Sequence, residues 1–370
     1  MKTLITVLCL VFSLNSVAQI INGTVYDENK KPLPNVNIYF DGTTFATISD
    51  ANGKFKLDYN YKGNNVLVIS CIGYRTVFFT DIDSKKDLNI SMRRLMNDLK
   101  EVVVYRKDKF TRKEKLELFR KLFLGKTANA SKTLIKNEDD IYFKYDYKNH
   151  ILTAFSDNPL VIINPSLGYK INYNLAKFEV EFDRLSIKSH YVIKSFYQGF
   201  SFFEESNNSN EILINREKAF RGSQVHFFRD LSNNMLSKDK FLLYNTSPIN
   251  HITISSTNMV DDSNNNNNTS RPLKQELCFK TNNGDEGLIK VEILPQSWQD
   301  LSKKAFASFD IEYDKNEKST IIFETNSFTI DRNGNNSNIG NIIFSGKIAE
   351  KKVGDMLPLN YKSISGKFMQ

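Results

Sequence analysis

Hydrophobic and polar residues alternate in short runs along most of the chain, and clusters of turn-forming residues separate these runs. Runs of this kind, bounded by Gly, Asn, Asp and Pro, are typical of β-strands. Between Gly23 and Arg93 the pattern predicts about seven strands in roughly seventy residues. That density indicates a small immunoglobulin-like or transthyretin-like β-sandwich.

Turn chemistry sets the limits of these first strands. The segment Asp27–Pro32 separates two of them, because Asp and Asn fold back on their own backbone and Pro presets its φ angle. At Asp50–Gly53 a tight turn has Gly where a positive φ is needed. The run Val66–Cys71 is almost wholly apolar, which favours a strand that is buried on both faces.

The order of these turns and strands carries a family resemblance. Between Ile20 and Arg94 the chain contains the segments GTVYD, KPLPNVNIYFDGT, ISDANGKFKL and SCIGYRT. This succession resembles the carboxypeptidase regulatory-like domain, which is found in exported proteins of Bacteroidetes-type bacteria and in front of many TonB-dependent outer-membrane receptors. The resemblance implies a β-sandwich domain, and it implies no peptidase activity.

Residues Met1–Ala18 form a separate segment. Lys2 is followed by an apolar run, and small residues then precede Gln19, which is the pattern of a secretory signal peptide. We therefore expect an exported protein in the periplasm or associated with the outer membrane. In such an oxidising compartment Cys71 and Cys278 can either pair or remain two free, buried thiols, and we favour the free thiols.

The sandwich is expected to span residues 19–95 and to be followed by a basic linker at 96–136. Within this linker the spacing predicts a short amphipathic helix at 111–124, with Thr111 and Glu114 in a capping box and Gly125 at its end. Its apolar stripe is expected to dock on the protein's own core, with a membrane surface as the alternative.

Positive charge is concentrated in this linker. From Lys100 to Lys136 twelve basic residues stand against four acidic ones, while the whole chain has a net charge of +8. We expect a solvated basic face, with an anionic membrane surface as the alternative contact, and we expect no nucleic-acid partner in an exported protein. The candidate contact residues are Lys107, Lys109, Arg112, Lys113, Arg120 and, farther along the chain, Trp298.

The segment Leu99–Tyr105 contains E-V-V-V, which in TonB-dependent receptors leads from the sandwich into the plug. Here the segment Val102–Val104 predicts one further strand. A receptor barrel needs about twenty strands of about ten residues, and the remaining chain is too short for them. We therefore expect no complete TonB-dependent transporter.

Residues 137–370 are predicted to form a larger antiparallel β-rich domain with one or two helices, so the fold class is mainly β. A helix is expected over 211–234, bent or broken at Gly222–Ser223, and a polar loop at 261–268. The stretches LTAFSDNPLVI, AFRGSQVHFFRDL and KKVGDMLPLNY resemble an uncharacterised segment of small exported Bacteroidetes proteins, which implies no activity. Predicted strands are 141–145, 151–155, 161–163, 169–173, 178–182, 190–196, 241–244, 252–255, 276–280, 288–294, 308–313, 320–324, 328–331 and 342–345.

Motifs for chemistry are weak. None of the four histidines begins an H-x-x-E or H-E-x-x-H pattern, so we expect no metal and no cofactor. The D-x-N-x-N segment Asp331–Asn335 lacks the Gly and the distal Glu of a calcium loop and is interpreted as a hairpin turn. We interpret His226 as a packed helical histidine. Trp298 is a candidate exposed platform for a glycan.

These observations favour a non-catalytic exported envelope protein that binds or scaffolds a protein or glycan through its β-sandwich module. An accessory role in TonB-linked outer-membrane uptake is the first alternative. The second is a hydrolase of unrecognised type in the C-terminal domain.

Overall fold

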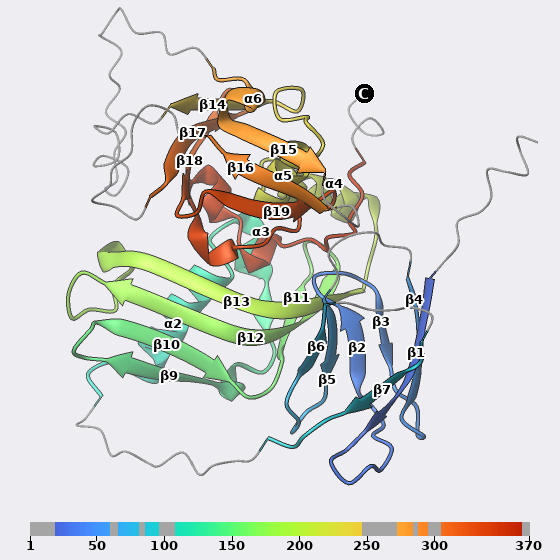
Figure 1. Cartoon of the computed structure of the whole chain (residues 1–370). Coiled ribbons are helices and arrows are strands. Elements are labelled where there is room, and N and C mark those ends of the chain that lie inside the picture. Colours follow the sequence, from blue (N-terminus) through green and yellow to red (C-terminus); the bar gives the residue numbers. More distant parts are fainter. Residues whose placement is uncertain are drawn as a thin grey trace, which may run out of the picture. The chain divides into compact units, whose positions relative to one another are not determined.

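The computed structural model describes residues 19–59, 66–80, 86–95, 108–245, 272–283, 288–294 and 305–364. It divides into two compact units, Met1–Val102 and Val103–Gln370, and most of its regular structure is strand (Figure 1). The predicted signal peptide, the strands expected at 102–104 and 252–255 and the loop expected at 261–268 lie outside the described residues. The mainly β fold class is confirmed.

The described residues of the first unit form a β-sandwich of seven strands, the number predicted. One sheet has the order β4-β1-β7 and the other the order β3-β2-β5-β6. Strand β1 pairs antiparallel with β4 and parallel with β7. The strands are β1 (Gln19–Tyr26), β2 (Asn37–Phe40), β3 (Ala46–Ile48), β4 (Lys54–Tyr59), β5 (Leu67–Ser70), β6 (Val77–Phe79) and β7 (Leu88–Ser91).

Alternation along β4 builds the interior of this sandwich. Phe55, Leu57 and Tyr59 are buried while the lysines and the aspartate between them are exposed, which is the period-two pattern of a strand with one face on a core. Phe40 of the other sheet meets Tyr59 with ring centroids 4.7 Å apart. Before β4, Gly53 has φ +72°, and an added Cβ would lie 2.4 Å from the Val25 carbonyl oxygen, so only glycine fits.

The second unit begins with α2 (Arg112–Phe123), α3 (Ala128–Lys132) and a six-stranded sheet. This sheet has the order β8-β11-β12-β10-β9, and β13 pairs with β12. The segments 169–173 and 178–182, predicted as two strands, form one long strand, because a bulge between Leu175 and Lys177 continues the ladder. The strands are β8 (Leu134–Ile135), β9 (Ile141–Asp146), β10 (Ile151–Ser156), β11 (Leu160–Asn164), β12 (Tyr169–Phe182) and β13 (Val192–Glu205).

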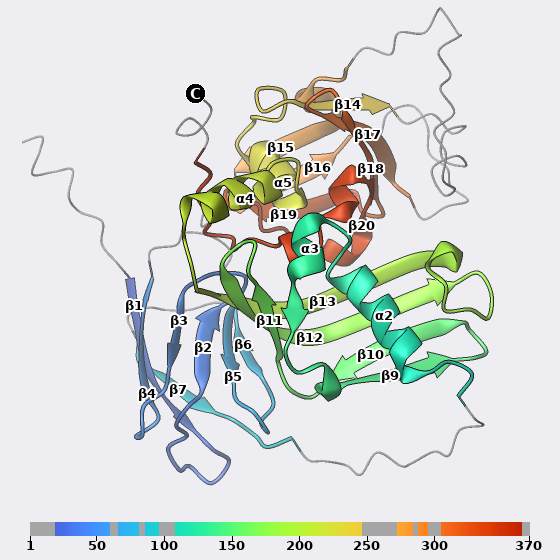
Figure 2. The same ribbon diagram turned by 180° about the vertical axis from the view of Figure 1, so that it is seen from behind.

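Helix α2 packs on this sheet with its apolar face (Figure 2). Its capping box between Thr111 and Glu114 is present as predicted. Phe119 is fully buried, and its ring centroid lies 4.6 Å from that of Phe178 and 6.0 Å from that of Phe143. The docking interpretation of the apolar stripe is confirmed, and this part of the expected linker belongs to the core of the second unit.

The rest of the described second unit adds two longer helices, one short helix and two further sheets. Helices α4 (Asn210–Phe220) and α5 (Gln224–Ser232) are separated at Gly222–Ser223, as predicted. The sheets have the orders β14-β17-β18-β20 and β15-β16-β19. The strands are β14 (Phe241–Asn245), β15 (Phe279–Asn283), β16 (Leu288–Ile293), β17 (Ala307–Tyr313), β18 (Glu317–Phe323), β19 (Ser327–Asp331) and β20 (Ile342–Gly346).

One strand prediction was half wrong. The segment 276–280 begins as a short helix, α6 (Gln275–Cys278), and only then enters β15. Cys278 and Phe279 are consecutive and both buried, an arrangement that a strand with a single core face does not allow. Cys278 and Cys71 are both free thiols, and Cys71 is half-buried. The expected hairpin turn at Asp331–Asn335 is present, with the Asp331 carboxylate accepting from two backbone N–H groups.

Lys351 and Lys352 donate hydrogen bonds to backbone carbonyls at the C-terminal ends of α4 and α2. Lys351 lies after η6 (Lys347–Glu350), and its ammonium donates to the carbonyls of Lys218 and Arg221 at the end of α4. The Lys352 ammonium donates to the Leu122 carbonyl of α2 at 2.9 Å. Ammonium groups stabilise helix C-termini by satisfying free carbonyls. Burial lowers the pKa of Lys352 to about 8.

Candidate functional site

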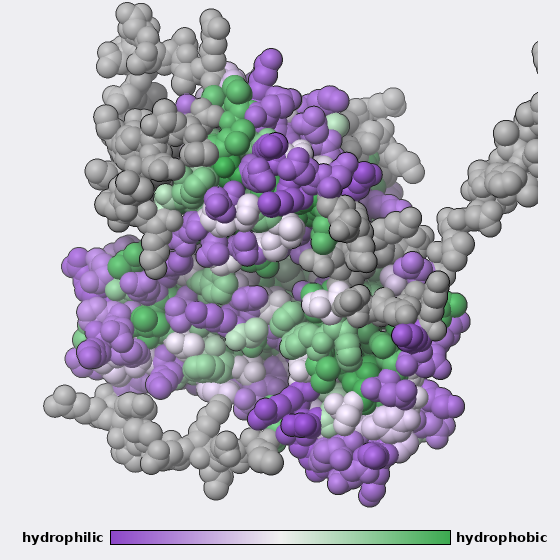
Figure 3. All heavy atoms as spheres, viewed as in Figure 1, coloured by the Kyte–Doolittle hydropathy of each residue, from purple (hydrophilic) through white to green (hydrophobic). Residues whose placement is uncertain are grey.

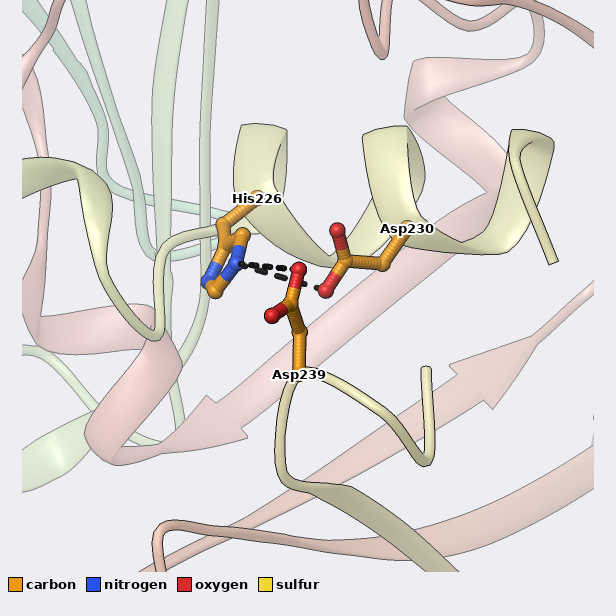
Figure 4. A group of neighbouring side chains, drawn as sticks. All are labelled: His226, Asp230 and Asp239. Carbon is orange, nitrogen blue, oxygen red and sulfur yellow. Dashed lines mark ion pairs between the residues drawn. The ribbon is translucent and has the colours of Figure 1, made fainter. Parts of the chain in front are cut away.

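A buried polar cluster lies at the start of α5. The Ser223 side chain caps this helix by accepting from the His226 backbone N–H at 3.1 Å. His226 and Asp230 are four residues apart, so they lie on the same face of the helix. Asp239 approaches them from the segment that follows α5 (Figure 4). Its own backbone N–H donates to the Met235 carbonyl at 2.9 Å.

The three side chains converge, but their polar atoms are poorly paired. His226 Nε2 lies 3.3 Å from Asp230 Oδ2 and 4.0 Å from Asp239 Oδ2. His226 is 1% exposed and Asp230 6%, and neither Nε2 nor Oδ2 has a partner with hydrogen-bond geometry in the described part of the chain. The Asp239 side chain is 37% exposed, so the cluster reaches solvent on that side.

The other ring nitrogen fixes the tautomer of His226. Its Nδ1 accepts a hydrogen bond from the Gly222 backbone N–H at 3.0 Å, so the proton of the neutral ring is on Nε2. Three aromatic rings enclose the imidazole: the centroids of Phe220, Phe241 and Tyr313 lie 4.6, 5.0 and 5.6 Å from its own. His226 is therefore a packed histidine, as interpreted from the sequence.

Burial decides the charge of the cluster. Burial, together with the nearby guanidinium groups of Arg221 and Arg229, lowers the pKa of His226 to about 3. Burial, together with the adjacent carboxyl group of Asp239, raises the pKa of Asp230 to about 7. The contact between His226 and Asp230 thus joins a neutral imidazole to a carboxyl group, and it is not an ion pair near neutral pH.

The cluster does not fit a metal site, although its ligand atoms lie within 4.8 Å of one another. A metal would need the lone pair of Nε2, with the proton on Nδ1, and ligating histidines donate that proton to an acceptor. Here Nδ1 faces a backbone N–H donor. With a metal on Nε2, the Nδ1–H of His226 would face the backbone N–H of Gly222, and these two donors would have no acceptor between them.

The cluster is also unsuited to acid–base catalysis. A general base must present a free lone pair within reach of the proton it removes. Nδ1 of His226 is occupied by Gly222, and Nε2 carries a proton inside the protein. Among the described residues, no Ser, Thr or Cys side chain has a hydrogen bond to this imidazole.

A charged network continues from the cluster toward the end of the chain. Arg221 Nη1 lies 3.8 Å from Asp239 Oδ1, and Arg221 Nε donates to Glu217 Oε1 at 2.8 Å. The Glu217 carboxylate also accepts from the Tyr361 hydroxyl at 2.9 Å and from the Ser363 hydroxyl at 2.7 Å. Burial alone would raise the pKa of Glu217, but these hydrogen bonds outweigh it and lower the pKa.

A groove of about 260 Å³ lies apart from this cluster, on the side of the six-stranded sheet that does not carry α2. Hydrophilic and hydrophobic residues are intermixed over this sheet on the face shown in Figure 3. Lys177 Nζ lies 3.4 Å from Glu179 and 5.7 Å from the centroid of the Phe196 ring. The groove is lined by Lys177, Glu179, Glu181, Lys194, Phe196 and, from η5 (Ile339–Asn341), Gly340.

The contact residues predicted from the sequence do not form one free surface. Lys107 and Trp298 lie outside the described residues, whereas Lys109 and Lys113 are exposed. Arg112 and Arg120 are bound within the protein, to residues of η1 (Glu138–Asp140) and the start of β9. The basic stretch is therefore in part a set of internal contacts, which the sequence pattern does not reveal.

The cluster of His226, Asp230 and Asp239 was not predicted from the sequence. A signal for half of it was present, because His226 and Asp230 have i,i+4 spacing on a predicted helix. Asp239 gave no signal, since only the folding back of the segment after α5 brings it to the helix.

Comparison with known proteins concerns mainly the first unit. Residues 21–104 match the family model of the CarboxypepD_reg-like domain. TonB-dependent receptor P39 of Formosa agariphila is 34% identical over 92 residues, which are 25% of this chain and 9% of the receptor. The chain thus spans less than a tenth of that relative.

A solved type II cohesin–X-dockerin complex from Acetivibrio cellulolyticus shares 18% identity, with a TM-score of 0.19, over 20% of this chain and 58% of that chain. Similarity this low supports no conclusion. No helix in the described ranges is long and apolar enough to span a membrane. The family and receptor matches fit a cell-envelope protein with a β-sandwich module. Residues 21–104 are thus a CarboxypepD_reg-like domain, as the sequence resemblance indicated.

Proposed function

We propose that the protein is a non-catalytic component of the cell envelope that binds or scaffolds a protein or glycan partner. The observation that supports this most is the state of the His226 cluster. It gathers a histidine and two carboxyl groups, yet it buries them with the imidazole in a tautomer that neither a metal nor a base can use. The CarboxypepD_reg-like domain and its similarity to a TonB-dependent receptor support an envelope location.

The groove beside β13 is the surface we assign to the partner. Phe196 gives it a half-buried aromatic face, and lysines and glutamates surround that face. Lys177 and Glu179 neutralise each other, and Lys194 stands opposite Glu181 in the strand register. A surface with balanced charge and one aromatic ring favours a polar partner without strong net charge.

Binding of residues 19–370 to purified cell envelopes of the source bacterium tests this assignment. Phe196→Ala should reduce the bound fraction by about tenfold, because aromatic anchors dominate binding free energies. Phe155→Ala is the matched control, since Phe155 is an exposed ring on β10 of the same sheet. Equal binding of both variants and the wild type would exclude the groove as the contact.

The non-catalytic part of the proposal has its own test. The same purified protein is incubated with peptide and glycan substrates, and no turnover is expected. Hydrolysis that persists through repeated purification and disappears in a point variant would overturn it and favour the hydrolase alternative.

An accessory role in TonB-linked uptake is the second candidate, favoured by the receptor match. This role predicts that the protein copurifies with an outer-membrane receptor from gently solubilised membranes. Recovery of the protein only as a free monomer from the periplasmic fraction would count against it.

A further inference from the structure

We propose that Asp230 and Asp239 form a proton-controlled latch, in which one shared proton holds the exposed segment Ser237–Lys240 against α5. This inference does not depend on the proposed partner. It concerns how the second unit responds to the pH of its surroundings.

The geometry of the cluster requires a proton between the carboxyl groups. An ionised carboxylate has only acceptors, and oxygens of the two aspartates lie within 4.8 Å of each other. The donors beside them are Nε2–H of His226, 3.3 Å from Asp230 and 4.0 Å from Asp239, and Arg221 Nη1, 3.8 Å from Asp239. Among the described residues, the buried Asp230 Oδ2 has no partner with hydrogen-bond geometry. A proton on one carboxyl group turns two facing acceptors into a hydrogen-bonded pair, as in other sites where two carboxylates meet.

The groups around the pair do not replace that proton. Arg221 is shared with Glu217, and Lys351 donates to carbonyls at the end of α4. Arg229 donates to the carbonyls of Tyr361 at 2.9 Å and of Leu359 at 3.2 Å. The titratable and charged groups that face the pair are Glu217 of α4, Arg221 directly after α4, His226 and Arg229 of α5, Tyr313 of β17, and Lys351 after η6.

Few side-chain contacts hold the segment that carries Asp239, and the backbone of this segment is joined to the Met235 carbonyl and to the Asp314 N–H. Leu236 before it is buried in the core, and Phe241 after it begins β14. Between these anchors, Ser237, Lys238 and Lys240 are exposed. The Lys240 ammonium pairs at 2.8 Å with the exposed Asp314. Asp239 is thus the one side chain of Ser237–Lys240 that reaches back into the described polar cluster.

The sign of the effect follows from the direction of the pKa shift. The closed latch raises the pKa of Asp230 to about 7, whereas an open, solvated Asp230 would have its ordinary value near 3.8. The proton therefore favours the closed state at low pH, and this stabilisation is lost as the pH rises through about 7. The opening constant should increase by up to about tenfold per pH unit between pH 5 and pH 7 and then level off.

Hydrogen exchange of the Asp239 amide, which donates to the Met235 carbonyl at 2.9 Å, measures this opening in the full chain after correction for intrinsic chemical exchange. In the wild type, protection should decrease by up to about a hundredfold from pH 5 to pH 7. In Asp230→Asn, the amide donates a hydrogen bond at every pH, so protection should be independent of pH. Asp314→Asn removes the surface ion pair of Lys240 but leaves both carboxyl groups of the latch in place, so it should retain the wild-type pH dependence.

The outcomes separate the latch from a merely structural cluster. If the wild type and Asp230→Asn show the same pH dependence, the proposal is overturned. If Asp230→Asn loses protection throughout the second unit, titration of the wild-type Asp230 carboxyl carbon by NMR decides. A midpoint near pH 7 supports the latch, and one near pH 4 excludes it.

Discussion

Helices α2 and α5 both pack one face on a hydrophobic core, but they differ in how well their polar side chains are paired. Both are short, capped at the N-terminus by a hydroxyl group, and buried on one face. In α2 the polar atoms of Arg112 and Arg120 find partners on η1 and β9. In α5, His226 Nε2 and Asp230 Oδ2 are buried and have no partner of good hydrogen-bond geometry within the described ranges of the chain.

The contrast shows that a high density of charged residues in a sequence does not by itself predict a binding surface or a pH-sensitive site. The basic stretch around α2 looks like a binding surface, yet some of its basic side chains are bound to residues of the fold itself. Buried Lys115 illustrates this, since its ammonium pairs with Asp108. Burial alone would raise the pKa of Asp108, but hydrogen bonds from Lys115 and Tyr147 outweigh it and lower the pKa. The cluster of His226, Asp230 and Asp239 at α5 has fewer charged groups, but its buried polar atoms have fewer hydrogen-bond partners.

The largest effect is expected where α2 meets the sheet. Phe119→Ala removes a fully buried ring that packs on Phe123, Phe143 and Phe178, and should reduce the free energy of unfolding by about 3–5 kcal/mol. Urea unfolding followed by circular dichroism measures this. Leu134→Ala, at an exposed position on β8, should change stability by less than about 0.5 kcal/mol. A small effect of Phe119→Ala would mean that α2 is not a core helix.

How far the sequence predicted this molecule differs between its two units. In the first, local turn residues such as Gly53 define each strand, so all seven were placed. In the second, the α2 cap and the break at Gly222 were also local and were predicted. The continuity of β12 was not, because a bulge that bridges Leu175 and Lys177 depends on pairing with the distant β13.

The candidate site follows the same rule. The pair His226 and Asp230 was accessible from helical spacing, whereas Asp239 and the Gly222 hydrogen bond that fixes the tautomer arise from tertiary structure. The pairing of Arg120 with Glu138 also joins residues 18 positions apart. No periodic pattern in the sequence encodes such contacts.

The second prediction concerns the polar side of the comparison. His226→Leu fills much of the same space but leaves the buried Gly222 N–H unpaired, so the free energy of unfolding at pH 8 should decrease by about 1–3 kcal/mol. Folding lowers the pKa of His226 to about 3, whereas the unfolded chain binds a proton below about pH 6.5. The free energy of unfolding of the wild type therefore decreases as the pH falls below 6.5 because of this histidine, and the leucine variant lacks that decrease.

Consequently, the decrease in the free energy of unfolding that His226→Leu causes relative to the wild type should be smaller at pH 5 than at pH 8, by up to about 2 kcal/mol. Urea unfolding at the two pH values measures the difference. His190→Leu replaces an exposed histidine at η2 (Ser189–Tyr191) and should change stability little and equally at both. A deficit of His226→Leu that does not vary with pH would show that the imidazole is not held neutral.

The smallest effect tests whether the charges of α2 are internal contacts. Arg120 donates to both oxygens of Glu138, at 2.6 Å for the Nε contact, but its side chain is 44% exposed, so the pair is screened by solvent. Arg120→Gln should cost about 0.3–1 kcal/mol at low ionic strength and less in 1 M salt. Lys113→Gln, at an exposed position about two turns before Arg120, should cost less than about 0.5 kcal/mol at either salt concentration. If the two variants behave alike in urea unfolding, the guanidinium of Arg120 is as available to an external partner as the ammonium of Lys113. The contrast between a helix with internally paired charges and one with unpaired buried groups would then be limited to α5.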